Sequence, residues 1–265
     1  MSKTVFGEKA FDDWYSARYG ARWPNLKRAL LDPPAQVALF DGLLKAYYLD
    51  AGSVEAVSAL PLENISTILD MCAAPGGKSL YIASHMPADA TLVCNEYSRE
   101  RKRRLQQVIE DHIPVDIRNR IVITGRDASR WSRYEQCAFD RILLDAPCSS
   151  ERHVLSSSVH LAQWSPARIK NLAQRQWALL SGAWLVLKPG GSLVYSTCAL
   201  SYEENDGIID RLLKKYTDVS VSSQQLSGGK GERLVHGFHV LPDTSGGSGP
   251  LYYVLLHKHS PTLDT

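Results

Sequence analysis

The chain has 265 residues, of which 44% are hydrophobic and 22% are charged, and its net charge is +2 at pH 7. This composition is typical of a globular protein with a full core, and it excludes a disordered or fibrous chain. No apolar run is long enough to span a membrane, and residues 1–4 lack the apolar core of a secretory signal. We therefore expect an intracellular protein.

The N-terminal residues 11–31 predict two amphipathic helices, broken between Gly20 and Pro24. Aromatic and basic side chains alternate along them, namely Trp14, Tyr15, Arg18, Tyr19, Arg22, Trp23, Lys27 and Arg28. They fit two interpretations: a surface that stacks on bases and binds phosphates, or a cap whose rings pack on the core. With further helices expected over 35–46 and 52–60, residues 1–60 should form a helical extension packed on a domain of residues 61–265.

From Ser66 onward, short apolar runs alternate with helical stretches. Strands are expected at 68–69, 91–94, 120–123, 139–144 and 192–195, with helices at 78–85, 98–112 and 165–187 between them. This order is typical of a parallel sheet covered on both faces, so we predict a Rossmann-like α/β fold. Residues 188–191 should form the turn that leads into the fifth strand.

The C-terminal third predicts one more helix and a closing strand. Ser201 and Glu204 have the spacing of a capping box, which would begin a helix running to about Tyr216. Polar and glycine-rich residues at 222–225, 228–231 and 245–249 predict loops rather than a second domain. The apolar run 251–256 predicts a strand that closes the sheet.

A glycine turn joins the first of these strands to its helix, with the sequence Met-Cys-Ala-Ala-Pro-Gly-Gly-Lys-Ser at residues 71–79. A phosphate-binding P-loop would need glycine at Cys72, and Pro75 removes a backbone donor. A dinucleotide fingerprint would need more than the pair Gly76 and Gly77. The turn therefore favours a nucleoside cofactor with one small anionic group, such as the carboxylate of S-adenosylmethionine. A tight turn with only a structural role is the alternative.

Polar residues follow five of the predicted strands, where a sheet of this kind binds its ligands. They are Asp70, Glu96, Asp127, the Asp145–Cys148 segment and the pair Thr197 and Cys198. Glu96 is placed to accept hydrogen bonds from ribose hydroxyls, and Asp127 to accept one from an adenine amino group. Either acid alone would more often be a solvated loop charge, but their joint placement favours a cofactor site.

The thiols of Cys148 and Cys198 follow strands that are expected to be neighbours. A thiolate that adds to C6 of a pyrimidine makes C5 a nucleophile, which can take a methyl group from a sulfonium. A buried Asp145 that keeps its proton would donate to cytosine N3 and stabilise the charge on the ring. Two structural cysteines are the alternative, and the residues alone do not rank the two thiols.

The remaining cysteines, Cys72, Cys94 and Cys137, bring the total to five, and no two of the five have Cys-x-x-Cys spacing. An odd number without such a pair fits neither a disulfide framework nor a structural zinc site. We therefore expect reduced thiols and no metal.

The motifs at residues 69–79, 145–148 and 195–198, with Glu203, Glu204 and Asn205, resemble the signatures of the Sun family of RNA cytosine-5 methyltransferases, over about residues 65–216. The resemblance implies a class I S-adenosylmethionine-dependent methyltransferase that acts on RNA. It implies that Cys198 is the nucleophile, that Cys148 assists release of the methylated base, and that Lys78 and Asp145 lie at the target cytosine. The implied cofactor residues are Cys72, Ala73, Ala74, Pro75, Gly76, Gly77, Lys78, Glu96, Arg101, Asp127, Ala128 and Asp145.

Residues 149–153, Ser-Ser-Glu-Arg-His, depart from the Ser-Gly-x-Gly of many members. They are similar to a subgroup that includes mitochondrial rRNA and tRNA enzymes, so rRNA is the first expected substrate and tRNA the second. Without a separate RNA-binding domain, recognition would come from the catalytic domain, the RNA shape or a partner protein. We expect a monomer in the cytoplasm, or alternatively in the mitochondrial matrix.

The candidate RNA surface combines His153 with the basic residues Arg99, Arg101, Lys102, Arg103 and Arg104, beside Arg18, Arg22, Lys27 and Arg28. A solvated helix and a loop histidine without a role are the alternatives. Two other functions stay open. An N- or O-methyltransferase would leave Cys198 idle, and a catalytically silent RNA-binding assembly factor would need neither thiol.

Overall fold

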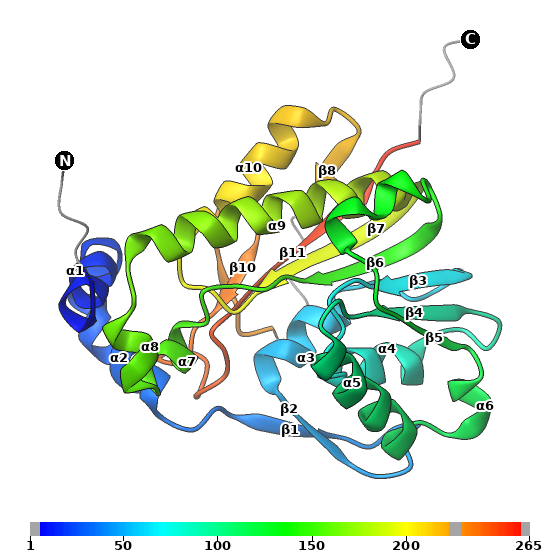
Figure 1. Ribbon diagram of the computed structural model, residues 1–265, viewed down its shortest axis with the longest axis horizontal. Coiled ribbons are helices and arrows are strands. Elements are labelled where there is room, and N and C mark those ends of the chain that lie inside the picture. Colours follow the sequence, from blue (N-terminus) through cyan, green and yellow to red (C-terminus); the bar gives the residue numbers. More distant parts are fainter. Residues whose placement is uncertain (1–5, 223–228, 261–265) are drawn as a thin grey trace.

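The computed structural model describes residues 6–222 and 229–260. Its main sheet has the strand order β5-β4-β3-β6-β7-β11-β10-β9, and β8 pairs with β11 (Figure 1). The strands are β3 (Thr67–Asp70), β4 (Thr91–Asn95), β5 (Ile121–Thr124), β6 (Phe139–Asp145), β7 (Leu187–Thr197), β8 (Val219–Val221), β9 (Glu232–Arg233), β10 (Phe238–Val240) and β11 (Leu251–Lys258). β3 to β7 are parallel and β11 is antiparallel to β7, which confirms the Rossmann-like sheet and its closing strand.

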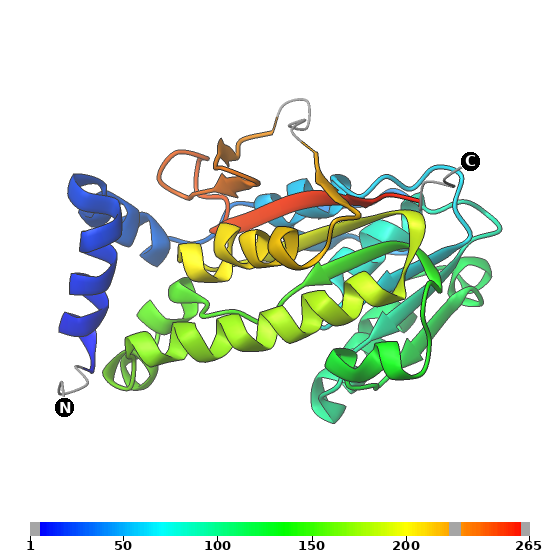
Figure 2. The same ribbon diagram turned by 90° about the horizontal axis from the view of Figure 1, so that it is seen from above.

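Helices cover both faces of the sheet (Figures 1 and 2). One face carries α3 (Ala51–Ser58), α4 (Gly77–His85) and α5 (Arg99–His112), and the other carries α9 (Pro166–Val186) and α10 (Asp206–Lys215). Successive strand residues point to opposite faces, so Leu143 packs in the first core cluster while Ile142 and Leu144 pack in the second. All three are fully buried, because a parallel sheet between two helical layers has no solvent-exposed face.

Strand β7 begins earlier than the sequence predicted. Leu187 pairs with Phe139, and the next pair joins Ser192 to Arg141, so the expected turn at 188–191 is a bulge inside the strand. A side chain at Gly191 would place its Cβ 2.9 Å from the Asp140 carbonyl oxygen, so the backbones can approach only because this residue is glycine.

The helix expected over 35–46 is wrong. This stretch forms a hairpin of β1 (Gln36–Leu39) and β2 (Tyr47–Asp50), with Gly42 at φ +71° in the connection. The hairpin packs on the start of α4, because a Cβ at Gly77 would lie 2.8 Å from side-chain atoms of both Tyr47 and Leu49. This tertiary contact overrides the local apolar pattern that favoured a helix.

Two C-terminal expectations also change. The described part of 222–249 is not only loop, because it contributes β9 and β10, while residues 223–228 of the predicted loops lie outside the described residues.

The predicted capping box of Ser201 and Glu204 is not formed. Ser201 Oγ donates to Glu204 Oε2 at 2.8 Å instead, and the Glu204 carboxylate is fully buried. Buried donors around Glu204 satisfy that carboxylate better than a helix end would.

The N-terminal helices α1 (Glu8–Tyr19) and α2 (Trp23–Leu31) lie at one end of the molecule, beside the start of α9 (Figures 1 and 2). Phe11, Tyr15 and Trp23 are buried in an aromatic cluster with Trp164, and the Tyr15 and Trp23 rings stack at 5.1 Å. The structure favours the cap interpretation, because these rings face the core rather than solvent.

Arg22 joins this cap to the C-terminal segments. Its guanidinium donates to both oxygens of Glu232 at 2.7 and 2.6 Å, and to both oxygens of Asp243 at 2.6 and 2.9 Å. We expect Arg22→Ala to lower the free energy of unfolding by about 1–3 kcal/mol, because it leaves two part-buried carboxylates without their cation. Urea denaturation measures the loss. Arg28→Ala is the control, since exposed Arg28 contacts Asn25, and equal midpoints for the two variants would contradict the prediction.

Candidate active site

The ends of β6 and β7 place a lysine, a carboxylate and a hydroxyl together. Asp145 and Ser196 are partners in the parallel ladder, and the Ser196 hydroxyl donates to Asp145 Oδ1 at 2.8 Å. Lys78, from the first turn of α4, donates to Asp145 Oδ2 at 2.7 Å. Both Asp145 oxygens thus accept hydrogen bonds, so Asp145 is an acceptor here and not the donor to cytosine N3 that the sequence analysis expected. Burial lowers the pKa of Lys78, but the charge and the hydrogen bond of Asp145, together with the charge of Asp70, outweigh burial and leave that pKa above its ordinary value. Lys78 therefore stays an ammonium at neutral pH.

The two thiols meet directly after these strands. Cys148 Sγ and Cys198 Sγ are 2.6 Å apart, and the Ser150 hydroxyl lies 3.2 Å from Cys198 Sγ and 3.5 Å from Cys148 Sγ. The hydrogen bond to Cys198, followed by burial, raises the pKa of Cys148 well above its ordinary value. Cys148 therefore keeps its proton at neutral pH.

Ser150 is a site residue that the sequence analysis missed. Its backbone has φ +53°, in the left-handed region that a residue with a side chain rarely adopts. Strain of this kind gathers at functional sites. The available signal was its position, because Ser150 stands where many relatives of the Sun family carry glycine.

A cavity of about 520 Å³ opens beside these groups, within the range of about 300–1,000 Å³ that is usual for small-ligand sites. Its lining includes Lys78, Asp145 and Cys198, with Arg152 and His153 from α7 (Glu151–Leu155). Other walls come from the end of β2, the start of α3 and the segment that leads into β11, through Asp50, Ser53, Gly249, Pro250 and Leu251. Cys148 is absent from this lining, so Cys198 is the thiol that faces the cavity.

A second hollow lies at the ends of β3, β4 and β5. Its lining includes the predicted cofactor residues Cys72, Glu96, Arg101, Asp127 and Ala128. Glu96 accepts from the Ser98 backbone at 2.8 Å and lies 3.3 Å from Arg101, whose other nitrogen donates to the Ala74 carbonyl at 2.8 Å. Arg101 thus ties the acid after β4 to the glycine turn after β3.

Asp127 has a second role in the structure. Its carboxylate accepts from the backbone and the hydroxyl of Ser129, and so begins the short helix η2 (Ala128–Arg133). This cap holds Asp127 at the rim of the second hollow with 42% of its side chain exposed. The carboxylate therefore remains accessible to a ligand.

Asn95 was missed by the sequence analysis. It is buried, its amide donates to the carbonyls of Met71 and Arg126, and its oxygen accepts from the Arg126 backbone. One side chain thus fixes the segments after β3 and β5 around the end of β4. Its position directly before Glu96, at a strand end, was the available signal.

Asp70 lies below the glycine turn and not in either cavity lining. Its carboxylate is 1% exposed and accepts from the Ser79 hydroxyl at 2.6 Å, and burial raises its pKa to about 7. The expectation that Asp70 directs a reactive group at the sheet edge is therefore wrong.

The glycine turn itself depends on Gly76. Its φ of +125° lets the turn run into α4 while Ala73 and Ala74 stay buried.

One basic residue of α5 is held at the glycine turn. Arg101 donates to the Ala74 carbonyl although 52% of its side chain is exposed, and Arg99, Arg103 and Arg104 are exposed as well. Lys102 is only half-buried. In the N-terminal cap, Arg18 and Arg22 are paired with acids, and Lys27 pairs with Glu8 and Asp12. His153 is the candidate RNA residue that lines the cavity beside Cys198.

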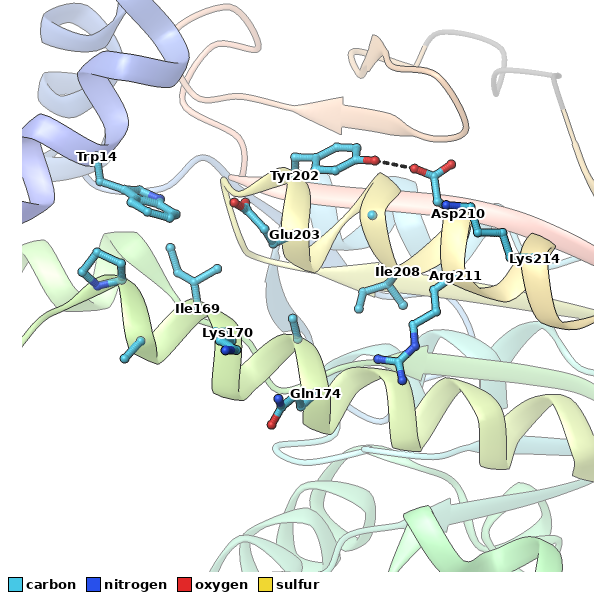
Figure 3. Close-up of a pocket in the computed structure, with 14 residues that line it drawn as sticks. Trp14, Ile169, Lys170, Gln174, Tyr202, Glu203, Ile208, Asp210, Arg211 and Lys214 are labelled. Atoms are coloured by element: carbon cyan, nitrogen blue, oxygen red, sulfur yellow. Dashed lines mark hydrogen bonds between the residues drawn. The ribbon is translucent and has the colours of Figure 1, made fainter. Parts of the chain in front are cut away.

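A further cavity of about 780 Å³ lies between α1, α9 and α10, as Figure 3 shows. Trp14, Ile169 and Ile208 give it apolar walls, and Lys170 and Arg211 add charge. None of the predicted catalytic or cofactor residues is in its described lining. Its size alone therefore does not make it the reaction site.

Within residues 6–222 and 229–260, no group of three or more His, Cys, Asp or Glu side chains could hold a metal ion. In the same ranges, no helix has the length and apolar character needed to cross a bilayer.

The sequence of this chain matches a known protein family. A family model described as 16S rRNA methyltransferase RsmB/F matches residues 57–257. The chain belongs to the RsmB/F family. This membership confirms the resemblance seen in the motifs, and with it the class of S-adenosylmethionine-dependent methyltransferases.

Similar proteins include RNA methyltransferases of two kinds. The 5-cytosine rRNA methyltransferase NSUN4 of Mus musculus is 35% identical, covering 85% of this RsmB/F chain and 63% of that protein. The mitochondrial tRNA (cytosine(34)-C(5))-methyltransferase of Mus musculus is 40% identical, covering 71% of this chain and 53% of that protein. The structure of NSun6 from Pyrococcus horikoshii with SFG has a TM-score of 0.68 at 26% identity, covering 81% of this chain and 53% of that one. The chain spans about half to two thirds of the length of these relatives.

Proposed function

We propose that this chain transfers a methyl group from S-adenosylmethionine to C5 of cytosine in RNA. The observation that carries the proposal is the pair of thiols beside the Lys78–Asp145 ion pair, at one edge of the sheet. Methyl transfer to nitrogen or oxygen needs no thiol, whereas attack on C5 requires a nucleophile to add at C6 first.

Cys198 is the proposed nucleophile, because it lines the cavity whereas Cys148 does not. Its thiolate adds to C6, and the π electron pair of the C5–C6 double bond then bonds C5 to the methyl group, whose bond to the sulfonium sulfur breaks. Water takes the C5 proton, the C5–H electron pair re-forms the double bond, and the S–C6 bond breaks with its electron pair returning to Cys198. Cys148, adjacent to that sulfur, is the proposed group that assists this release.

Lys78 and Asp145 are the proposed contacts to the cytosine edge. Addition of a thiolate at C6 moves negative charge toward N3 and O2 of the ring. A lysine ammonium held in place by a carboxylate stabilises such charge without reorganising during the reaction. Their shared cavity with Cys198 supports this assignment.

The second hollow is the proposed cofactor site, and its chemistry fits S-adenosylmethionine. Glu96 and Asp127 supply carboxylates suited to ribose hydroxyls and an adenine amino group, and the start of α4 suits a small anionic group. Bound there, the cofactor supplies an electrophilic methyl group. The proposed contacts are Cys72, Ala73, Ala74, Pro75, Gly76, Gly77, Lys78, Glu96, Arg101, Asp127 and Ala128, with Asp145 at the boundary between the two sites.

Ribosomal RNA is the proposed substrate and tRNA the second choice, since the relatives named above act on one or the other. The target cytosine must be unstacked so that a thiol can reach C6. We propose residues 1–60 as a cap and 61–265 as the catalytic domain of a monomer, with a partner protein possible for target choice. The described cysteines are all free thiols, which suits the cytoplasm or the mitochondrial matrix.

The test is nucleoside mass spectrometry after incubation of the protein with methyl-labelled S-adenosylmethionine and RNA. We expect label in 5-methylcytidine, with rRNA labelled more than tRNA. Label in an N- or O-methylated nucleoside would replace the proposal with the first alternative. RNA binding without any label, in protein that binds the cofactor, would favour the silent assembly factor.

A further inference from the structure

A pair of buried carboxyl groups lies directly behind the thiols. Glu151 and Glu204 are each 0% exposed, and both contact the hydroxyl of Ser149, which is itself fully buried. The distance from Ser149 Oγ to Glu204 Oε2 is 2.6 Å. The mechanism proposed above uses none of these groups, although Ser149 is bonded directly to Cys148 in the chain.

The two carboxyl groups have different donors around them. Glu204 accepts from the Ser149 backbone at 2.9 Å, from the Gln176 amide at 2.9 Å and from the Ser201 hydroxyl at 2.8 Å. Glu151 accepts from the Tyr15 hydroxyl and, at 3.2 Å, from the Leu200 backbone. Burial raises the pKa of Glu204 too, but its larger set of donors favours a carboxylate there more than at Glu151.

A single proton on Glu151 completes the network. Ser149 has one hydroxyl hydrogen and two carboxyl neighbours, so it can donate to Glu204 only if it accepts from a protonated Glu151. Hydrogen bonds then run in one direction, from Tyr15 to Glu151, to Ser149 and to Glu204. Burial, and next the charge of Glu204, raise the pKa of Glu151 to about 7, which agrees in direction with this arrangement.

The other titratable or charged groups around the pair do not neutralise a second negative charge. Tyr15 and Tyr19 of α1 face Glu151, and the Tyr195 hydroxyl donates to the Glu204 carbonyl. Arg168 of α9 donates to the Ser149 carbonyl at 3.3 Å rather than to either carboxyl group. Cys148 is a neutral thiol. Two buried like charges this close cannot both be ionised at low cost.

The network connects both thiol-bearing loops. Ser149 and Glu151 follow Cys148, while Leu200, Ser201 and Glu204 follow Cys198. Gln176 also donates to the Pro147 carbonyl at 2.9 Å, and Tyr15 adds the N-terminal cap. This buried group of hydrogen bonds therefore helps to fix the relative position of the two sulfur atoms, beyond the end of the β6–β7 ladder.

We propose that Glu151 is a positioning residue that holds the Cys148 and Cys198 loops together while it carries the proton shared with Glu204, and releases them when that proton is lost. The proposal rests on the thiol chemistry proposed above. The sign follows from the protonation state: the loops are held at a pH below about 7, and ionisation of Glu151 adds a second buried charge as the pH rises.

The experiment compares Glu151→Gln with Glu204→Gln, since glutamine imitates a neutral acid and not a carboxylate. Single-turnover methyl transfer and the rate of Cys198 alkylation by iodoacetamide, located by peptide mass mapping, are measured from pH 6 to pH 9. Alkylation reports on the thiol even if methyl transfer fails. It therefore separates failure of this proposal from failure of the proposed function.

At pH 6 we expect Glu151→Gln to stay within about threefold of the wild type, and Glu204→Gln to lose about tenfold or more in both rates. The ratio of the Glu151→Gln rates to the wild-type rates should rise about tenfold between pH 6 and pH 9, because only the wild type ionises at this position. A constant ratio, or equal losses in the two variants at pH 6, would overturn the proposal. Circular dichroism at each pH confirms that both variants are folded.

Discussion

Replacing Cys198 by alanine should abolish methyl transfer, with a loss of about four orders of magnitude or more in the single-turnover rate. Without a thiolate at C6, C5 of cytosine is not nucleophilic enough to take the methyl group. The measurement is transfer of labelled methyl from S-adenosylmethionine to RNA. Cofactor affinity should stay within about threefold, because Cys198 lines the other cavity.

Cys148→Ala is the informative partner of that variant. If Cys148 assists release, methyl transfer should continue while the RNA stays attached to Cys198, and a covalent adduct should be visible on a denaturing gel. Cys137→Ala is the matched control, since Cys137 is exposed and outside both described cavity linings. An adduct in Cys198→Ala in place of Cys148→Ala would exchange the two roles. Normal transfer in both variants would point to the N- or O-methyltransferase.

The sheet could be predicted because its signals are local. A parallel strand covered on both faces reads as an apolar run, so β3, β4 and β6 stood out without any knowledge of their partners. The hairpin of β1 and β2 could not be predicted in this way. Tyr47 and Leu49 are held there by contact with Gly77, about 30 residues away in the chain, and no local pattern reports such a contact.

The site residues also divide into those that local signals predicted and those whose roles depend on distant contacts. Strand ends predicted that Asp145, Cys148 and Cys198 would gather at one edge, because the rule for ligand sites depends on topology alone. Glu204 has the spacing of a capping residue and instead accepts hydrogen bonds from Ser149 and Gln176. The capping-box spacing is present in the sequence, but it did not predict the role of Glu204. The donors that surround the Glu204 carboxylate come from distant parts of the chain.

Asp145→Asn should lower the rate of methyl transfer at saturating cofactor by about 100- to 1,000-fold, the usual cost of removing one preorganised electrostatic contact. The carboxylate holds the Lys78 ammonium at 2.7 Å, and an amide would leave that charge without a partner and free to turn away from the ring. Single-turnover kinetics at saturating S-adenosylmethionine measure the loss. Lys78→Met should give a loss of similar size, and the double variant should lose little more, because the two groups act as a unit.

The control lies at the other end of the same strand. Asp140 is the second residue of β6 and accepts from Lys188 at 2.8 Å, so Asp140→Asn breaks a similar ion pair at the end of the strand opposite Asp145. It should lower stability without changing the rate of the folded enzyme. The Asp145 carboxylate lines the cavity with Cys198 and is absent from the described lining of the second hollow. Because Asp145 is proposed to lie at the boundary between the two sites, Asp145→Asn should weaken cofactor binding by a smaller factor than it lowers the saturated rate. Weaker cofactor binding with an unchanged saturated rate would move Asp145 from the cytosine edge to the cofactor site.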